Sequence, residues 1–295
     1  MIKSTKCMLA LATLLLSASV AALNINLIDS SVDDPAQTLL DAVLAPNSGV
    51  SIVPGSVNFI GRVGDGDLAQ SALYSDFNLA PSAGNGPTVE IADGIFLTTG
   101  VANIPLTNTI NNWSHGSGGP GVTQPGTGAN ALLTELSGVS TRDQNVLEFE
   151  FTLDNPQANA VSIEIVFGSE EYPTQSVTDI FGFFVDGINF AFFEDGSLIA
   201  NNPATDFIDN PVGEGRYGIE YNGITRRLTI TGLVDPEASS HTAVIAIADT
   251  SDAIFDSGVF VSSFRAGTAG NGGGHWSCSS FATASCSASG PNHGS

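Results

Sequence analysis

The chain is poor in basic residues. Its 295 residues include 30 acidic but only eight basic side chains, and both lysines, Lys3 and Lys6, stand near the N-terminus. Without the first 22 residues, six arginines face 30 acids, which gives a net charge of −24. A chain with this imbalance does not hold nucleic acid or an anionic membrane by electrostatic attraction. We therefore expect neither as a partner.

Long apolar runs are also missing, apart from a short one at the start. Lys3 and Lys6 precede an apolar run over residues 8–15, and small residues follow up to Ala22. This pattern is typical of a secretory signal peptide, with cleavage after Ala21 or Ala22. The run is too short for a comfortable membrane span, and no later segment is longer. We therefore expect residues 1–22 to be a signal peptide and the protein to be secreted, with or without association with the cell surface.

Cysteine is scarce, and one of the three cysteines lies in the expected signal peptide. Cys278 and Cys286 remain, close together near the C-terminus. In an oxidising compartment we expect them to form a local disulfide. Gly, Ser and Ala dominate from residue 268 onward, which predicts a flexible tail over residues 268–295.

Residues 23–267 are long enough for one large all-β domain or two small ones. Few charged residues and many Gly, Asn, Ser, Thr and Phe favour strands and turns over helix bundles. Apolar and polar residues alternate from Leu147 to Phe151, as in a strand with one buried face. Helical spacing is limited to residues 35–44 and 131–136. We predict an all-β fold: a large single-domain, jelly-roll-like β-sandwich of about twelve strands with one or two short helices.

Two dipeptides mark expected hairpins. Asp186-Gly187 joins apolar residues 181–185 to residues 188–193, and Asn222-Gly223 joins residues 217–221 to residues 224–230. Such dipeptides supply the positive φ angles that two-residue turns require. The first hairpin is apolar on both faces, so we expect it to lie mid-sheet or under a cover.

Two acidic stretches each follow an apolar run that has the pattern of a strand. The apolar runs are residues 161–167 and residues 243–248. Carboxylates gathered at strand ends repel one another unless a cation or hydrogen-bond donors neutralise them. Calcium takes six to eight oxygen ligands, often from flexible loops. We therefore predict one or two calcium sites. The candidate ligands are Glu170, Glu171, Asp179, Asp249, Asp252 and Asp256.

The same acids have other possible roles. They can close turns or accept backbone donors at strand ends. If the strand continued, Glu170 and Glu171 would point to opposite sides, so that at most one would face a given ion. A glycoside hydrolase needs two carboxyls across a cleft, usually one lined by aromatic residues. After signal cleavage the only tryptophans are Trp113, in a Gly-rich stretch, and Trp276, in the tail, which disfavours that enzyme class.

Several segments resemble the choice-of-anchor L domain, a module of bacterial secreted and surface proteins, both in their residues and in their order along the chain. The most specific are Ser169-Glu170-Glu171-Tyr172 and Asp256-Ser257-Gly258-Val259-Phe260. The other matching segments are residues 57–61, 93–100, 138–143, 146–151, 166–168, 179–187, 221–225 and 247–255. The resemblance covers nearly all of residues 50–266 and implies a domain without an assigned enzymatic activity. The family is named for varied C-terminal anchors, and we recognise no such anchor here, so we expect a released or non-covalently retained protein.

The leading hypothesis is a secreted, non-catalytic surface or matrix protein with a calcium site, acting in adhesion or biofilm. Its expected partner is an extracellular polysaccharide or a surface protein. The alternative is a self-assembling extracellular structural subunit that associates through exposed strand edges or Gly-rich segments. A carbohydrate-active enzyme ranks third.

Overall fold

The computed structural model describes residues 22–64, 68–82, 86–108, 125–173, 178–200 and 206–269, and the backbone of residues 277–278 and 286–287. The predicted signal peptide lies outside the described residues except for Ala22. Most of the Gly-rich stretch around Trp113 also lies outside them.

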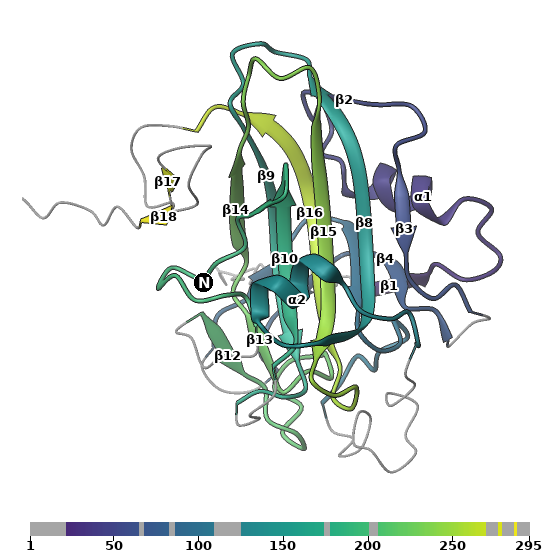
Figure 1. Cartoon of the computed structure of the whole chain (residues 1–295). Coiled ribbons are helices and arrows are strands. Elements are labelled where there is room, and N and C mark those ends of the chain that lie inside the picture. The colour runs from purple at the N-terminus through teal and green to yellow at the C-terminus, as the bar shows by residue number, and fades with distance from the viewer. Residues whose placement is uncertain are drawn as a thin grey trace, which may run out of the picture.

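Two antiparallel sheets face each other and form a sandwich (Figure 1). The eight-stranded sheet contains, in spatial order, β1 (Asn24–Leu27), β4 (Ser71–Ser75), β7 (Gly94–Thr98), β16 (Ser257–Gly267), β9 (Ala160–Ser169), β13 (Gly223–Thr225) and β12 (Phe207–Asp209), with β14 (Leu228–Leu233) also paired to β9. The six-stranded sheet contains β11 (Ile188–Asn189), β10 (Ile180–Val185), β15 (His241–Thr250), β8 (Thr141–Leu153) and β2 (Val50–Ile52), with β3 (Asn58–Ile60) also paired to β8. A separate ribbon pairs β5 (Asn78–Leu79) with β6 (Val89–Glu90). The predicted all-β sandwich is confirmed.

The main core lies between the two sheets. It is filled by the side chains that alternate along the strands and point inward. Leu147, Phe149 and Phe151 of β8 pack there with alternate residues of β9 and β16, such as Phe167 and Val259. This confirms the one-sided burial expected for β8. A second apolar cluster covers the outer face of the eight-stranded sheet, and a third covers the outer face of the six-stranded sheet. Parts of both sheets are therefore buried on two faces.

Two short helices form where they were expected. In α1 (Pro35–Val43), the Asp34 carboxylate accepts a hydrogen bond from the Gln37 N–H at 3.0 Å, and Pro35 occupies the first turn. In α2 (Ala131–Ser137), Asn130 caps the start, and Gly138, with φ at 74°, ends the helix. Figure 1 shows α2 across the outer face of the six-stranded sheet.

The hairpin at Asp186-Gly187 is confirmed. Both residues have positive φ, 51° and 80°, as the tight turn requires. The second arm, β11, is shorter than expected. All six residues of β10 are buried, because the core lies on one face and α2 covers the other.

The hairpin predicted around Asn222-Gly223 is wrong. Residues 217–221 form no strand, and β13 pairs instead with β12 and β9. Tyr217, Ile219 and Tyr221 are each buried against the outer face of the eight-stranded sheet. Burial of these three side chains outweighs the local turn preference of Asn-Gly.

The tail contains a second short ribbon, in which β17 (Ser277–Cys278) pairs with β18 (Cys286–Ser287). Cys278 stands opposite Cys286 in this pairing. The cysteine side chains lie outside the described residues, so the disulfide stays a prediction.

Candidate functional site

The two acidic stretches meet at one end of the sandwich. In the eight-stranded sheet, Ser169 at the end of β9 pairs with Ser257 at the start of β16, and the Glu170 N–H donates to the Asp256 carbonyl at 3.1 Å. In the six-stranded sheet, Ile180 pairs with Ala248, which brings Asp179 next to the end of β15. The strand order of both sheets therefore gathers acids that are distant in sequence.

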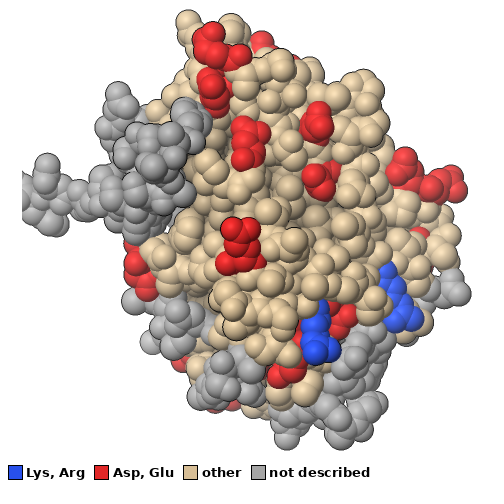
Figure 2. All heavy atoms as spheres, in the orientation of Figure 1, with Lys and Arg blue, Asp and Glu red and all other residues tan. Residues whose placement is uncertain are grey.

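These acids are buried, unlike the scattered acidic side chains of the surface in Figure 2. The cluster has seven carboxyl side chains, none more than 7 % exposed. They are Asp143, Glu170, Glu171, Asp179, Glu220, Asp249 and Asp256. Asp252, the sixth predicted ligand, is only half-buried but lies close enough for its charge to act on Asp179. We call the seven the carboxylate cluster.

Sequence reasoning missed two members of the cluster, Asp143 and Glu220. Asp143 lies in a bulge of β8, where the pairing with β15 shifts register, and its φ is 46°. Glu220 stands between the buried Ile219 and Tyr221, in the segment for which the sequence predicts a hairpin arm. A single acid within an apolar stretch was the available signal for Glu220.

Backbone donors reach at least two members of the carboxylate cluster. The Glu171 carboxylate accepts a hydrogen bond from the Asp179 N–H at 3.0 Å, and the Asp143 carboxylate accepts one from the Gly126 N–H at 2.7 Å. Four other buried oxygens have no hydrogen-bond partner. They are Asp179 Oδ2, Asp249 Oδ1, Glu220 Oε1 and Glu220 Oε2. A buried acceptor left without a donor costs about 1–3 kcal/mol, and more when it is charged.

The electrostatics of the cluster oppose ionisation. Burial raises the pKa of Asp179 well above its usual range, and the neighbouring charge of Asp249 raises it further. Burial and then the charge of Asp256 do the same to the pKa of Asp249. Burial and then the charges of Asp179 and Glu170 raise the pKa of Asp256. Each of these acids either keeps a proton near neutral pH or requires a cation.

Two pairs of carboxyls stand out within the cluster. Asp179 and Asp249 interact electrostatically, and so do Glu220 and Glu170. The pKa of Glu220 is raised first by burial and then by the charge of Glu170. The charge of Asp256 also raises the pKa of both Asp249 and Glu220.

Asparagine side chains fix the backbone beside Glu220. Asn210 Nδ2 donates to the carbonyls of Ile219 and Tyr221, each at 2.8 Å, and Asn222 Nδ2 donates to the Glu170 carbonyl at 2.6 Å. Asn210 thus holds the backbone on either side of Glu220, and Asn222 links this segment to the strand end that carries Glu170.

In the described part of the chain, no three or more His, Cys, Asp or Glu side chains are arranged to hold a metal ion as they stand. Coordination would require the carboxylates of the cluster to turn toward a common point. Calcium tolerates variable geometry and draws ligands from flexible loops, so such a rearrangement suits it better than it suits magnesium.

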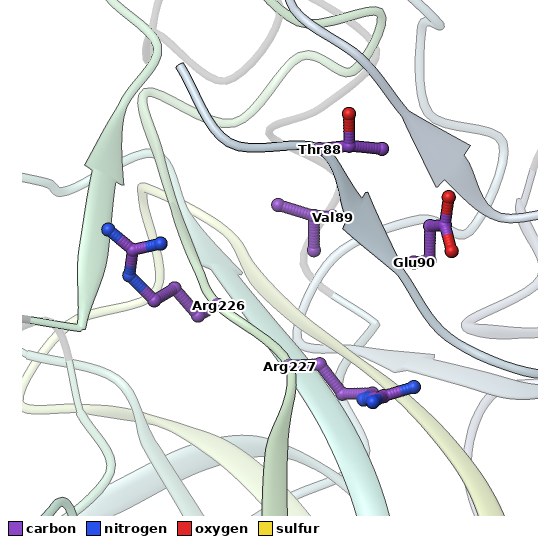
Figure 3. Close-up of a pocket in the computed structure, with 5 residues that line it drawn as sticks. All are labelled: Thr88, Val89, Glu90, Arg226 and Arg227. Carbon is purple, nitrogen blue, oxygen red and sulfur yellow. The ribbon is translucent and has the colours of Figure 1, made fainter.

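A surface cleft of about 390 Å³ lies elsewhere on the molecule, lined by Thr88, Val89, Glu90, Arg226 and Arg227 (Figure 3). Both arginines are exposed, and Arg227 lies 3.9 Å from Glu164. The cleft contains no member of the carboxylate cluster.

The comparisons with known proteins agree with the sequence resemblance. A family model described as the choice-of-anchor L domain matches residues 34–265. No curated protein matches the chain. The family match points to a bacterial surface-associated protein. Neither α1 nor α2, the helices of the described residues, is long and apolar enough to cross a membrane.

Proposed function

Because the chain belongs to the choice-of-anchor L family, we propose that it is a secreted, non-catalytic surface module whose carboxylate cluster binds calcium. One observation carries the calcium proposal: carboxylate oxygens of Asp179, Glu220 and Asp249 are buried within one cluster of acids and have no hydrogen-bond partners. Taking an ion out of water costs several kcal/mol even after the protein relaxes. A divalent cation offsets that cost by neutralising two carboxylates at once.

The chemistry of the donors favours calcium among biological cations. The cluster offers oxygen ligands, which hard cations prefer, and neither histidine nor cysteine is among its seven members. The candidate ligands are Glu170, Glu171, Asp179, Asp249, Asp252 and Asp256 from the sequence, joined by Asp143 and Glu220.

Calcium at this position would join the two sheets. Asp256 and Glu170 flank β16 and β9 of the eight-stranded sheet. In the six-stranded sheet, Asp179 directly precedes β10, and Asp249 belongs to β15. An ion bound by side chains from both sheets would hold the sheets together at one end of the sandwich. This role needs no catalysis, and the burial of the acids argues against access by a polysaccharide chain.

The test is thermal unfolding of the secreted chain in calcium and in chelator. At a calcium concentration 100 times Kd, binding to the folded state adds about 2.7 kcal/mol to the free energy of unfolding. For a domain of this size, this corresponds to a rise in Tm of about 5–10 °C. Asp249→Asn should lose most of the rise, whereas Glu150→Gln, an exposed change of the same charge on β8, should keep it. An equal Tm in calcium and in chelator would contradict the proposal that the carboxylate cluster binds calcium.

For the partner, we propose an extracellular polysaccharide or another surface protein, in adhesion or in a biofilm matrix. The cleft at Arg226 and Arg227 supports an acidic polysaccharide, because it offers two guanidinium groups on an otherwise acidic protein. A glycan array probed with the wild-type chain and with an Arg226→Ala/Arg227→Ala variant tests this. Large calcium-dependent assemblies in size-exclusion chromatography would favour the self-assembling subunit instead, with the edge strand β1 as a candidate contact.

A further inference from the structure

We propose that the cleft at Arg226 and Arg227 is one end of a longer groove, and that this groove selects an acidic polysaccharide whose charged sugars are separated by neutral ones. This inference rests on the acidic polysaccharide of the proposed function and specifies its charge pattern. The unequal distribution of charge along the groove carries it, because the arginines line one end and acids line the other.

A second cleft, of about 370 Å³, adjoins the first and shares Glu90 and Arg227 with it. Residues of the β5–β6 ribbon line both clefts, and the segment with Arg226 and Arg227, between β13 and β14, lies across from them (Figure 3). The volume of each cleft falls within the range of about 300–1,000 Å³ that is typical of small-molecule sites. Since the clefts share two residues, they form one continuous surface, which we call the ribbon groove.

The arginine end of the ribbon groove can bind an anionic group. Arg226 and Arg227 are both exposed. Arg227 lies 3.9 Å from Glu164, and Arg265 shares that carboxylate at 3.5 Å. Each guanidinium carries several N–H donors, so one carboxylate does not occupy all the donors of two arginines. Arg226 makes no ion pair within the described part of the chain. A sugar carboxylate or sulfate can therefore accept charge-assisted hydrogen bonds at this end.

The other end of the ribbon groove is acidic. Asp76, Glu90 and Asp93 line it, and all three are exposed. Asp93 accepts a hydrogen bond from the Asp76 N–H, and Glu90 accepts one from Asn78 Nδ2, each at 3.0 Å. These bonds hold the carboxylates in place and leave oxygen lone pairs that can accept from sugar hydroxyls. A second anionic group at this end would be repelled by the carboxylates.

A ligand that spans the ribbon groove must therefore present an acidic group to the arginines and uncharged hydroxyl or amide groups to the acids. A polysaccharide in which a uronic acid alternates with a neutral sugar meets both conditions. A polyuronate, which has a carboxylate on every sugar, meets only the first. A neutral polysaccharide meets only the second.

The experiment compares three tetrasaccharides by isothermal titration calorimetry. They are glucuronic acid alternating with N-acetylglucosamine, tetragalacturonic acid, and the neutral N-acetylglucosamine tetramer. We expect the alternating probe to bind most tightly and each of the others about fivefold more weakly, which is the effect of one exposed charge contact that is repulsive or lost. The preference over tetragalacturonic acid should shrink at high salt, because salt screens the repulsion between exposed charges.

Variants at the two ends should change different affinities. Glu90→Gln/Asp93→Asn removes two charges but keeps the acceptor oxygens, so it should strengthen binding of tetragalacturonic acid about fivefold and leave the alternating probe nearly unchanged. Arg227→Ala should weaken both acidic probes and leave the neutral tetramer unchanged. Arg62→Ala and Glu150→Gln are the matched controls, because neither residue lines the ribbon groove, and they should change none of the affinities.

The outcomes separate this inference from the proposed function. If tetragalacturonic acid binds the wild-type chain as tightly as the alternating probe, the charge pattern is wrong and the acidic polysaccharide stands. If no acidic probe binds, or if Arg227→Ala leaves acidic binding unchanged, both are overturned. A wild-type dimer that Arg226→Ala/Arg227→Ala converts to a monomer, with no probe bound, would assign the groove to a second copy of the chain and overturn the polysaccharide.

Discussion

Asp256 interacts electrostatically with several other members of the carboxylate cluster. Burial is the largest cause that raises its pKa. The charges of neighbouring acids raise it further, namely those of Asp179, Glu170, Asp143 and Glu171. Its carboxylate lies against Gly100, where a Cβ would come within 1.9 Å of Asp256 Oδ2 and 2.2 Å of Cγ. Any side chain at position 100 would therefore compete with the carboxylate for the same space.

Gly100→Ala should displace the Asp256 carboxylate and weaken calcium binding. Overpacking of this kind costs about 1–3 kcal/mol. If the displacement removes one ligand, calcium affinity should fall about tenfold or more. Titration calorimetry and denaturant unfolding measure the two effects. Gly267→Ala is the matched control, because a Cβ there would have nothing within 4 Å. Unchanged affinity in Gly100→Ala would mean that Asp256 does not bind the ion.

The sequence predicted acids at strand ends, and this holds for Glu170, Asp249 and their neighbours because an apolar run followed by acids is a local pattern. It did not predict Asp143 or Glu220. Asp143 enters the cluster through a β-bulge, and Glu220 through a segment that packs flat on a sheet. Both placements depend on contacts between distant parts of the chain, which no local pattern reports.

At the scale of elements, the strands that alternate or end at a strong turn were predictable. Apolar and polar residues alternate from Leu147 to Phe151, and these residues form part of β8. The same reasoning failed at Asn222-Gly223. There Asn222 donates to the Glu170 carbonyl, so its side chain stabilises a contact between segments and not a hairpin turn. A turn dipeptide predicts a hairpin only where both flanking segments can pair with each other.

The Asp186 hairpin gives a prediction at this scale. The Asp186 carboxylate accepts hydrogen bonds from the Thr242 N–H at 2.9 Å and contacts His241 Nδ1 at 2.8 Å, which ties the turn to the start of β15. Asp186→Ala should lower the free energy of unfolding by about 1–3 kcal/mol, because it leaves a buried histidine nitrogen without a partner and adds strain at positive φ.

Asp186→Asn is the control, since asparagine tolerates positive φ and keeps an acceptor oxygen. It should cost less than half as much in denaturant unfolding. Equal losses in the two variants would show that the negative charge of Asp186, and not the hydrogen bond or the backbone conformation, stabilises the hairpin.

For the whole molecule, the negative charge has two separate parts. The surface acids are spread out and solvated, and they contribute little to folding individually. The carboxylate cluster is different, because its acids are buried where their charges act on one another. The response of the protein to pH should therefore come mainly from the cluster and depend on calcium.

Burial and neighbouring carboxylates raise the pKa values of Asp179, Glu220, Asp249 and Asp256 well above their usual range. Without calcium, the folded state keeps protons on these groups above about pH 4, where the unfolded chain has lost them. The folded state then binds more protons than the unfolded state, so the free energy of unfolding falls as pH rises from about 4 through neutral. Calcium should reduce this fall, because it stabilises the ionised carboxylates in the folded state. Denaturant unfolding in chelator should thus give a higher free energy near pH 5 than near pH 7.5, and Asp249→Asn should shrink the difference. If stability in chelator rises over this range, the cluster is ionised in the calcium-free protein, and its charges are offset by groups other than calcium.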